Sequence, residues 1–346
     1  MAGTSTSHYV TLGKSGLQVC PIALGTLNFG KAKAFGVDTF ECFKILNEYY
    51  EGGGNFIDTA DHYSGAEKII GDWLAGGHAN RDDIVLSTKF TFPDNAMEAL
   101  NCFGNGRKNI HRALNGSLKR LGTDFIDLYW LHCWDGVTPV EEVVATLDAL
   151  VTSGKIRYWG LSNVPAWYAA KASMYSKNFI AMQLEYSLLE RSIEREHIPL
   201  AVEQGLGICA WSPLAGGILT GKYLTGVPTG RGRFDKDGNN IWAKFSQRDK
   251  DITNGLGQWA EARNCTAAQM AIMWVLRRAH VAIVGASSVK QLNGNMMAWP
   301  SLMGFQGSIA MKALDEVSCV APGHPYIYFE PAMRNKLTAG LVIRRR

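Results

Sequence analysis

The sequence predicts an α/β protein built as a (β/α)8 barrel of the TIM type, with a β-hairpin at its N-terminus. Three observations support this prediction. Strand-like and helix-like patterns alternate along the chain, the strands are continuous apolar runs, and 346 residues suit one barrel with insertions. Strands that are apolar throughout are buried on both faces, which is typical of parallel pairing.

The predicted elements follow one another in a regular order. Two short extended pieces flank a Gly-Lys-Ser-Gly turn between Tyr9 and Val19, and they predict the hairpin. The eight barrel strands are expected to end near Gly25, Asp58, Lys89, His132, Ser162, Glu185, Ser212 and Gly285. Amphipathic periodicity predicts helices over Thr39–Glu51, Ala66–Leu74, Arg107–Leu121, Val140–Thr152, Ala166–Tyr175, Glu194–Gln204, Ala267–Arg277 and Val289–Met297.

The pattern favours a single domain over residues 1–346, with a core from about 10 to 314 and a C-terminal tail from about 321 to 346. An open, doubly wound sheet is the alternative, and the absence of a GxGxxG fingerprint weakens it. The longest irregular region, Leu214–Gln247, follows the seventh strand. An insertion at that place is expected to lie over the mouth of a barrel site.

Composition excludes several classes of function. The net charge is only +4, and the one basic run is Arg344–Arg346, so nucleic-acid binding has no support. The seven cysteines are irregularly spaced, which predicts free thiols and no zinc site. The first eight residues do not resemble a signal peptide, and no apolar run is long enough to cross a bilayer. We therefore expect a cytoplasmic protein without a metal or a membrane partner, and the subunit number stays open.

Four polar residues are expected to share one site. Asp58, Lys89 and His132 end three consecutive strands, and Tyr63 follows Asp58 on the next loop. The carboxyl ends of parallel strands meet at one edge, and a buried Lys or Asp is tolerable only when it is paired. Each residue alone has an ordinary structural explanation, but together they favour a catalytic site. His62 is expected to point away from Tyr63.

Longer motifs carry a resemblance to a known family. They are Leu24–Thr26, Asn55–Ala60 with Tyr63, Ser87–Lys89, Leu131–His132, Gly154–Asn163, Trp211–Gly217 and Gly285–Leu292. The chain resembles the aldo-keto reductase superfamily, and within it the branch of bacterial aryl-alcohol-type reductases and potassium-channel β subunits. The resemblance implies a barrel that binds NADPH and reduces carbonyl compounds reversibly without a metal. It also implies that Asp58, Tyr63, Lys89 and His132 form the catalytic tetrad.

The chemistry of carbonyl reduction explains those four residue types. Tyr63 is the expected acid, although a free phenol has a pKa of about 10. Lys89 is expected to stabilise the phenolate and so lower that pKa, while Asp58 holds Lys89 charged and in place. His132 is expected to hydrogen-bond the substrate carbonyl and orient it.

The resemblance also places the cofactor at the loops after the last strands, where barrels commonly bind phosphate. The expected cofactor-binding residues are Gly25, Thr26, Asp58, Ser162, Asn163, Gln183, Trp211, Ser212, Pro213, Leu214, Gly216, Lys222, Arg233, Gly285, Ser287, Lys290, Gln291 and Asn295. Many family members carry Arg where this chain has Ser287, and that Arg binds the 2′-phosphate of NADPH. Lys290 or Arg233 is expected to supply the cation instead, so NADPH is favoured over NADH.

The substrate is expected to be a small carbonyl compound or alcohol with a bulky or cyclic body. Aromatic loop residues suggest this, namely Phe29, Phe90, Trp134, Tyr223 and Trp242. One alternative is a regulatory subunit that binds NADP(H) and turns over slowly, as the channel-associated relatives suggest. Another is a Schiff-base aldolase with Lys89 as the nucleophile.

Overall fold

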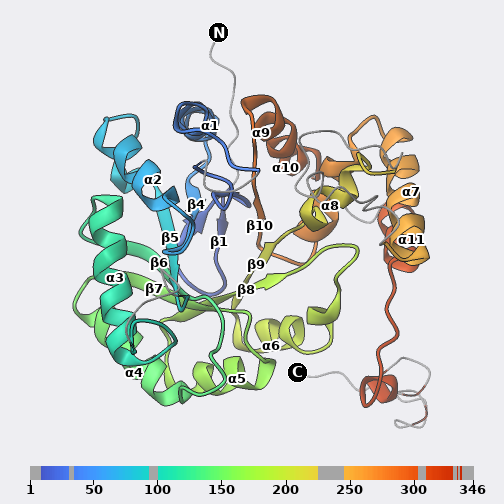
Figure 1. The fold of residues 1–346 in the computed structure, drawn as a ribbon. Coiled ribbons are helices and arrows are strands. Elements are labelled where there is room, and N and C mark those ends of the chain that lie inside the picture. The colour runs from blue at the N-terminus through green and yellow to red at the C-terminus, as the bar shows by residue number, and fades with distance from the viewer. Residues whose placement is uncertain are drawn as a thin grey trace.

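The computed structural model shows a closed barrel of eight parallel strands enclosed by helices (Figure 1). It describes residues 9–30, 35–92, 100–224, 245–302, 309–329, 333 and 336. The barrel strands are β3 (Ile22–Gly25), β4 (Phe56–Asp58), β5 (Val85–Phe90), β6 (Ile126–Leu131), β7 (Ile156–Ser162), β8 (Phe179–Glu185), β9 (Gly207–Trp211) and β10 (Val281–Val284). They pair in sequence order, and β10 closes the barrel against β3. The predicted (β/α)8 architecture is confirmed.

The helices that alternate with these strands form the outer layer in Figure 1. They are α1 (Thr39–Glu51), α2 (Ala66–Ala75), α3 (Arg107–Leu121), α4 (Val140–Thr152), α5 (Ala166–Tyr175), α6 (His197–Gln204), α8 (Ala267–Leu276) and α9 (Val289–Met296). Local signals account for many of their ends. The N–H of Glu41 donates to the side chain of Asp38 at 3.0 Å where α1 begins, and a capping box of Thr266 and Gln269 begins α8.

The N-terminal hairpin closes the amino end of the barrel. Its strands β1 (Val10–Thr11) and β2 (Gln18–Val19) are antiparallel, and Leu12 packs against the apolar barrel interior. Between them Gly13 has a φ of 61°, and a Cβ there would lie 2.6 Å from the backbone nitrogen of Gly207. Glycine is therefore required both for the turn and for the close approach. The hairpin leaves the carboxyl end of the strands as the place for a site.

A further helix, α7 (Gln247–Glu261), was not predicted from the sequence. Its composition is mostly polar and includes two glycines, which hid its periodicity. Its buried face is made by Ile252, Leu256 and Ala260, spaced four residues apart, and it packs against α8 and α11 (Ile309–Val317). The predicted irregular region before it begins with the 3-10 helix η3 (Ala215–Thr220), and its residues 225–244 lie outside the described part of the chain.

The last described elements are α10 (Ala298–Leu302) and the short 3-10 helix η6 (Tyr326–Phe329). All seven cysteines are free thiols. Within the described ranges, no helix combines the length and the apolar character that crossing a bilayer requires.

Two helix glycines give opposite expectations for the same substitution. A Cβ on Gly71 in α2 would lie 2.3 Å from the backbone oxygen of Arg120, whereas a Cβ on Gly255 in α7 would meet nothing within 4 Å. We predict that Gly71→Ala lowers the free energy of unfolding by about 1–3 kcal/mol because backbone must move. Gly255→Ala should raise it by about 0.5–1 kcal/mol because alanine loses less entropy on folding. Urea denaturation of both variants measures the difference, and a shift of the same sign in both would contradict it.

Candidate active site

The barrel brings the ends of β4, β5 and β6 together. Asp58 is the last residue of β4, Lys89 lies one residue before the end of β5, and His132 directly follows β6. The pairing register aligns Asp58 with Ser87, and Lys89 with Trp130. Adjacent parallel strands therefore carry these three side chains at one edge of the barrel.

Lys89 and Asp58 form a buried ion pair. The Nζ of Lys89 donates to Asp58 Oδ2 at 2.5 Å and to the backbone oxygen of Thr59 at 2.8 Å. The other carboxylate oxygen accepts from Ser87 Oγ at 2.8 Å and from Gln183 Nε2 at 2.9 Å. Lys89 is 0% exposed, so both charges depend on these partners to offset the loss of hydration.

The surroundings keep Lys89 charged. Burial by itself disfavours the ammonium, but the charge of Asp58 and the nearby Tyr63 outweigh that effect and raise the pKa of Lys89. The Nζ of Lys89 lies 5.0 Å from the centre of the Tyr63 ring. A permanent positive charge therefore sits beside the phenol.

His132 is a neutral imidazole. Burial first, then the charge of Lys89 and the neighbouring His62, lower the pKa of His132 to about 2. Its ring centre lies 6.0 Å from that of Tyr63, and its Nδ1 is buried with no hydrogen-bond partner among the described residues. A neutral imidazole can both donate and accept, so it suits a polar group of a ligand rather than a carboxylate partner.

His62 does not point away from Tyr63, so that expectation was wrong. The ring centres of His62 and Tyr63 are 5.0 Å apart, and the ring of His62 also lies 4.8 Å from His132 and 4.8 Å from Phe92. The reason is the turn that follows β4, in which the N–H of Tyr63 donates to the backbone oxygen of Ala60 at 3.1 Å. Adjacent residues alternate sides only in an extended strand.

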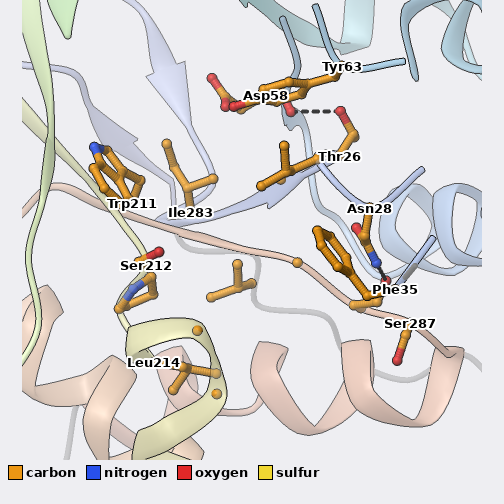
Figure 2. A pocket seen from close by; sticks show the side chains of 18 of the residues that line it. Thr26, Asn28, Phe35, Asp58, Tyr63, Trp211, Ser212, Leu214, Ile283 and Ser287 are labelled. Carbon is orange, nitrogen blue, oxygen red and sulfur yellow. Dashed lines mark hydrogen bonds between the residues drawn. The ribbon is translucent and has the colours of Figure 1, made fainter. Parts of the chain in front are cut away.

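A cavity of about 470 Å³ opens beside these residues. Its lining includes most of the residues predicted for catalysis and cofactor binding: Gly25, Thr26, Asp58, Tyr63, His132, Asn163, Gln183, Trp211, Ser212, Pro213, Leu214, Gly216, Lys222, Gly285, Ser287 and Gln291. Figure 2 shows Asp58 and Tyr63 at one end and Ser287 toward the other. Lys89 lies beneath this lining, fully buried.

Some predicted cofactor residues are placed elsewhere. Ser162 is buried, and its Oγ accepts from Asn163 Nδ2 at 3.0 Å. Asn295 is buried on α9, and Lys290 is exposed in the first turn of that helix. Neither is part of the cavity lining. Arg233 lies outside the described residues.

The predicted aromatic pocket differs from the aromatic wall in the structure. Phe29, Phe90 and Tyr223 are buried in the protein interior, and Trp134 packs against Tyr168 with ring centres 5.3 Å apart. None of these four lines the cavity. Trp242 lies outside the described residues.

Strand geometry explains one of these differences. Lys89 faces the barrel interior, so Phe90, the next residue of β5, faces the opposite way and packs against Tyr129. Phe92 lies beyond the strand and lines the cavity, because the backbone turns at Thr91, where φ is 135°. Other lining residues, which were not among the predicted site residues, are Leu27, Asn28, Phe35, His62, Thr220, Ile283, Val284 and Ala286.

The far half of the cavity has the features of a phosphate-binding loop. Gly216 and Gly217 have φ values of 65° and 97°, and Lys222 Nζ lies 3.0 Å from where a Cβ of Gly217 would be. The helix α9 begins nearby, with Ser288 as its cap. Open glycine backbone, a lysine and the positive end of a helix together fit a phosphate-containing ligand.

The polar groups at the two ends therefore suit an extended dinucleotide. The amide of Gln183 lines the end near Tyr63, and the side chain of Trp211 is held there by a 3.1 Å bond from its Nε1 to Asn163 Oδ1. Within the described ranges, no group of three or more His, Cys, Asp or Glu side chains is placed to hold a metal ion. The residues present thus fit a nicotinamide cofactor.

The barrel and the residues that line its cavity fit the oxidoreductases that act on carbonyl and alcohol groups with NAD(P)H, although a parallel barrel by itself supports many chemistries. The sequence comparisons identify this class. The model of the aldo/keto reductase family matches residues 21–303, and the chain belongs to that family.

Curated relatives cover most of the chain. It is 32% identical to norsolorinic acid reductase of Aspergillus flavus, over 84% of this chain and 76% of the relative. It is 37% identical to the uncharacterized oxidoreductase YrpG of Bacillus subtilis, over 84% and 90%. It is 31% identical to an NADP(+) aryl-alcohol dehydrogenase of Phanerodontia chrysosporium, over 91% and 86%.

The low pKa of His132 gives a direct test of its environment. Folded His132 should stay neutral as the pH falls from about 8 to about 4, because its pKa lies far below the 6.5 of a free imidazole. Nitrogen-15 NMR of labelled histidine should show ring shifts that do not move over this range. The ring signals of His132 are identified as those that are missing from the spectrum of the His132→Gln variant. Titration with a midpoint near 6.5 would contradict the buried, neutral imidazole.

Proposed function

We propose that this protein reduces an aldehyde or ketone to an alcohol with NADPH, reversibly, and that Tyr63 is the general acid. The observation that carries this proposal is the buried pair of Lys89 and Asp58 beside the ring of Tyr63. Keeping an ion pair without water is costly, and an ammonium held next to a phenol stabilises the phenolate that proton donation leaves behind.

When bound, the cofactor supplies the hydride. The carbonyl oxygen gains negative charge as the C=O double bond becomes a single bond, and Tyr63 donates its phenolic proton to that oxygen. Lys89 then stabilises the phenolate, and Asp58 keeps Lys89 in place. His132 holds the carbonyl oxygen by a hydrogen bond, which a neutral imidazole can donate at any physiological pH.

The cavity supports a cofactor that runs from Tyr63 to α9. The Nε2–H of Gln183 donates a hydrogen bond to Asp58. The amide oxygen of Gln183 is then available to accept a hydrogen bond from the carboxamide of the cofactor. Trp211 offers an aromatic face for the nicotinamide, and Lys222 lies where a pyrophosphate would pass. NADPH is favoured over NADH because one relative is named as an NADP(+) enzyme and Lys290 exposes its charge at the start of α9.

The aromatic wall favours a cyclic, aromatic substrate. Tyr63, Phe92 and Trp211 line the cavity, and aromatic walls suit flat rings. A relative named as an aryl-alcohol dehydrogenase points the same way. The seven free thiols fit a reducing compartment, so we also propose that the protein works in the cytoplasm.

The alternatives receive less support. The three relatives described above are named as a reductase, an oxidoreductase and a dehydrogenase, which favours an enzyme over a regulatory subunit. A Schiff-base aldolase needs an uncharged lysine as nucleophile. Lys89 has a raised pKa and no exposure, so it is a poor nucleophile.

The acid role of Tyr63 is tested by removing one oxygen atom. Tyr63→Phe should lower the turnover of an aryl aldehyde by at least ~10²-fold, because the general acid is lost. Cofactor affinity should be largely kept. Turnover is followed by the absorbance of NADPH, and affinity by quenching of tryptophan fluorescence. The matched control is Tyr50→Phe, whose hydroxyl bonds Asp83 at the exposed surface and should have no effect. Near-normal turnover in Tyr63→Phe would refute the acid role.

The two lysines near the phosphates should behave differently. Lys222→Ala should raise the dissociation constants of NADPH and NADH alike, by about tenfold, because the pyrophosphate is common to both. Lys290→Ala should raise the constant for NADPH more than that for NADH, because only NADPH carries the 2′-phosphate. Lys68→Ala is the control, because Lys68 lies on the exposed face of α2. Equal effects of Lys290→Ala on both cofactors would discredit its assignment.

A further inference from the structure

The imidazole of His62 lines the cavity beside Tyr63 and Phe92, and the reduction described above gives it no role. Its ring lies within 5.0 Å, centre to centre, of the rings of Tyr63, Phe92 and His132. It lines the cavity, and its side chain is 28% exposed. A ligand held by Tyr63 and His132 therefore comes within reach of this imidazole.

The two nitrogens of His62 have different surroundings. Nδ1 is buried and lies 3.6 Å from Asp61 Oδ1, and the side chain of Asp61 is 1% exposed. A carboxylate oxygen beside Nδ1 favours the tautomer that carries its proton on Nδ1. Nε2 is at the far end of the ring from the backbone, and it is not among the buried side-chain atoms that lack a hydrogen-bond partner. In that tautomer Nε2 presents a lone pair to the cavity, so it accepts a hydrogen bond.

We infer that His62 determines substrate specificity, and that its Nε2 accepts a hydrogen bond from a hydroxyl group on the ring of an aryl aldehyde or ketone. The inference rests on the proposed function, because it places the substrate carbonyl between Tyr63 and His132. It narrows the substrate class from aryl carbonyls in general to phenolic ones. An acceptor distinguishes a hydroxyl from a methoxy group, since only the hydroxyl has a proton to donate.

Geometry also selects the position of the hydroxyl. The ring of His62 lies 4.8 Å from that of His132, so the recognised group must be close to the carbonyl. A para hydroxyl lies at the opposite end of the substrate ring. An ortho hydroxyl bonds internally to the carbonyl oxygen and has no proton to spare. A meta hydroxyl remains, and it is both near the carbonyl and free to donate.

The experiment compares kcat/KM for four aldehydes with NADPH: benzaldehyde and its meta-hydroxy, meta-methoxy and para-hydroxy derivatives. The wild-type protein should prefer the meta-hydroxy compound to the meta-methoxy compound by about five- to tenfold, the value of one hydrogen bond. His62→Phe should abolish this preference, and His62→Gln should keep part of it because the amide oxygen still accepts. Phe92→Leu is the control, because it alters the wall without removing a polar atom and should change all four substrates alike.

Two failures would be distinguishable. If the wild-type protein turned over none of the four aldehydes, the proposed function would be refuted. Turnover of all four without a preference for the meta-hydroxy compound would overturn the inference about His62 alone, and this result needs no variant. An unchanged preference in His62→Phe would overturn it as well.

Discussion

The buried ion pair between Lys89 and Asp58 is the constraint on which the site depends. Its members come from β5 and β4, and the same carboxylate accepts a bond from Gln183 of β8, on the far side of the barrel. Two charges can stay in this interior only while every partner is present. Closure of the barrel is therefore a condition for the charged lysine, and the charged lysine is the condition for the proposed acidity of Tyr63.

The alternation of side chains along β5 connects this interior pair to the outer layer. Lys89 faces inward, and Thr88, the residue before it, faces outward. Its hydroxyl donates to Glu67 of α2 at 2.6 Å, and Glu67 also pairs with Arg120 of α3 at 2.5 Å. Thr88, Glu67 and Ser117 of α3 are all buried. The inner face of β5 thus carries the ammonium of Lys89, and its outer face is linked to α2 and α3 by polar contacts.

The loops contribute what the strands do not. Tyr63, His62 and Phe92 follow β4 and β5, outside any regular element, and their rings meet at the ring of His132. A rigid barrel with variable loops at its carboxyl edge is how one fold supports many specificities. In this chain the strand ends supply the groups proposed for proton transfer, and the loop residues supply the wall that a substrate ring would meet.

The sequence by itself determined the barrel strands, most of the helices around them and the polar residues at the strand ends. Apolar runs predicted where β4 and β5 end, and amphipathic periodicity predicted α3 over Arg107–Leu121, because these features depend on neighbours in the chain. The tertiary structure alone decided which loop rings enter the cavity. The side chain of Phe90 packs in the core, whereas that of Phe92 lines the cavity. The apolar face of α7 is buried by contacts with α8 and α11. Those outcomes depend on contacts between segments far apart in sequence, which no local pattern carries.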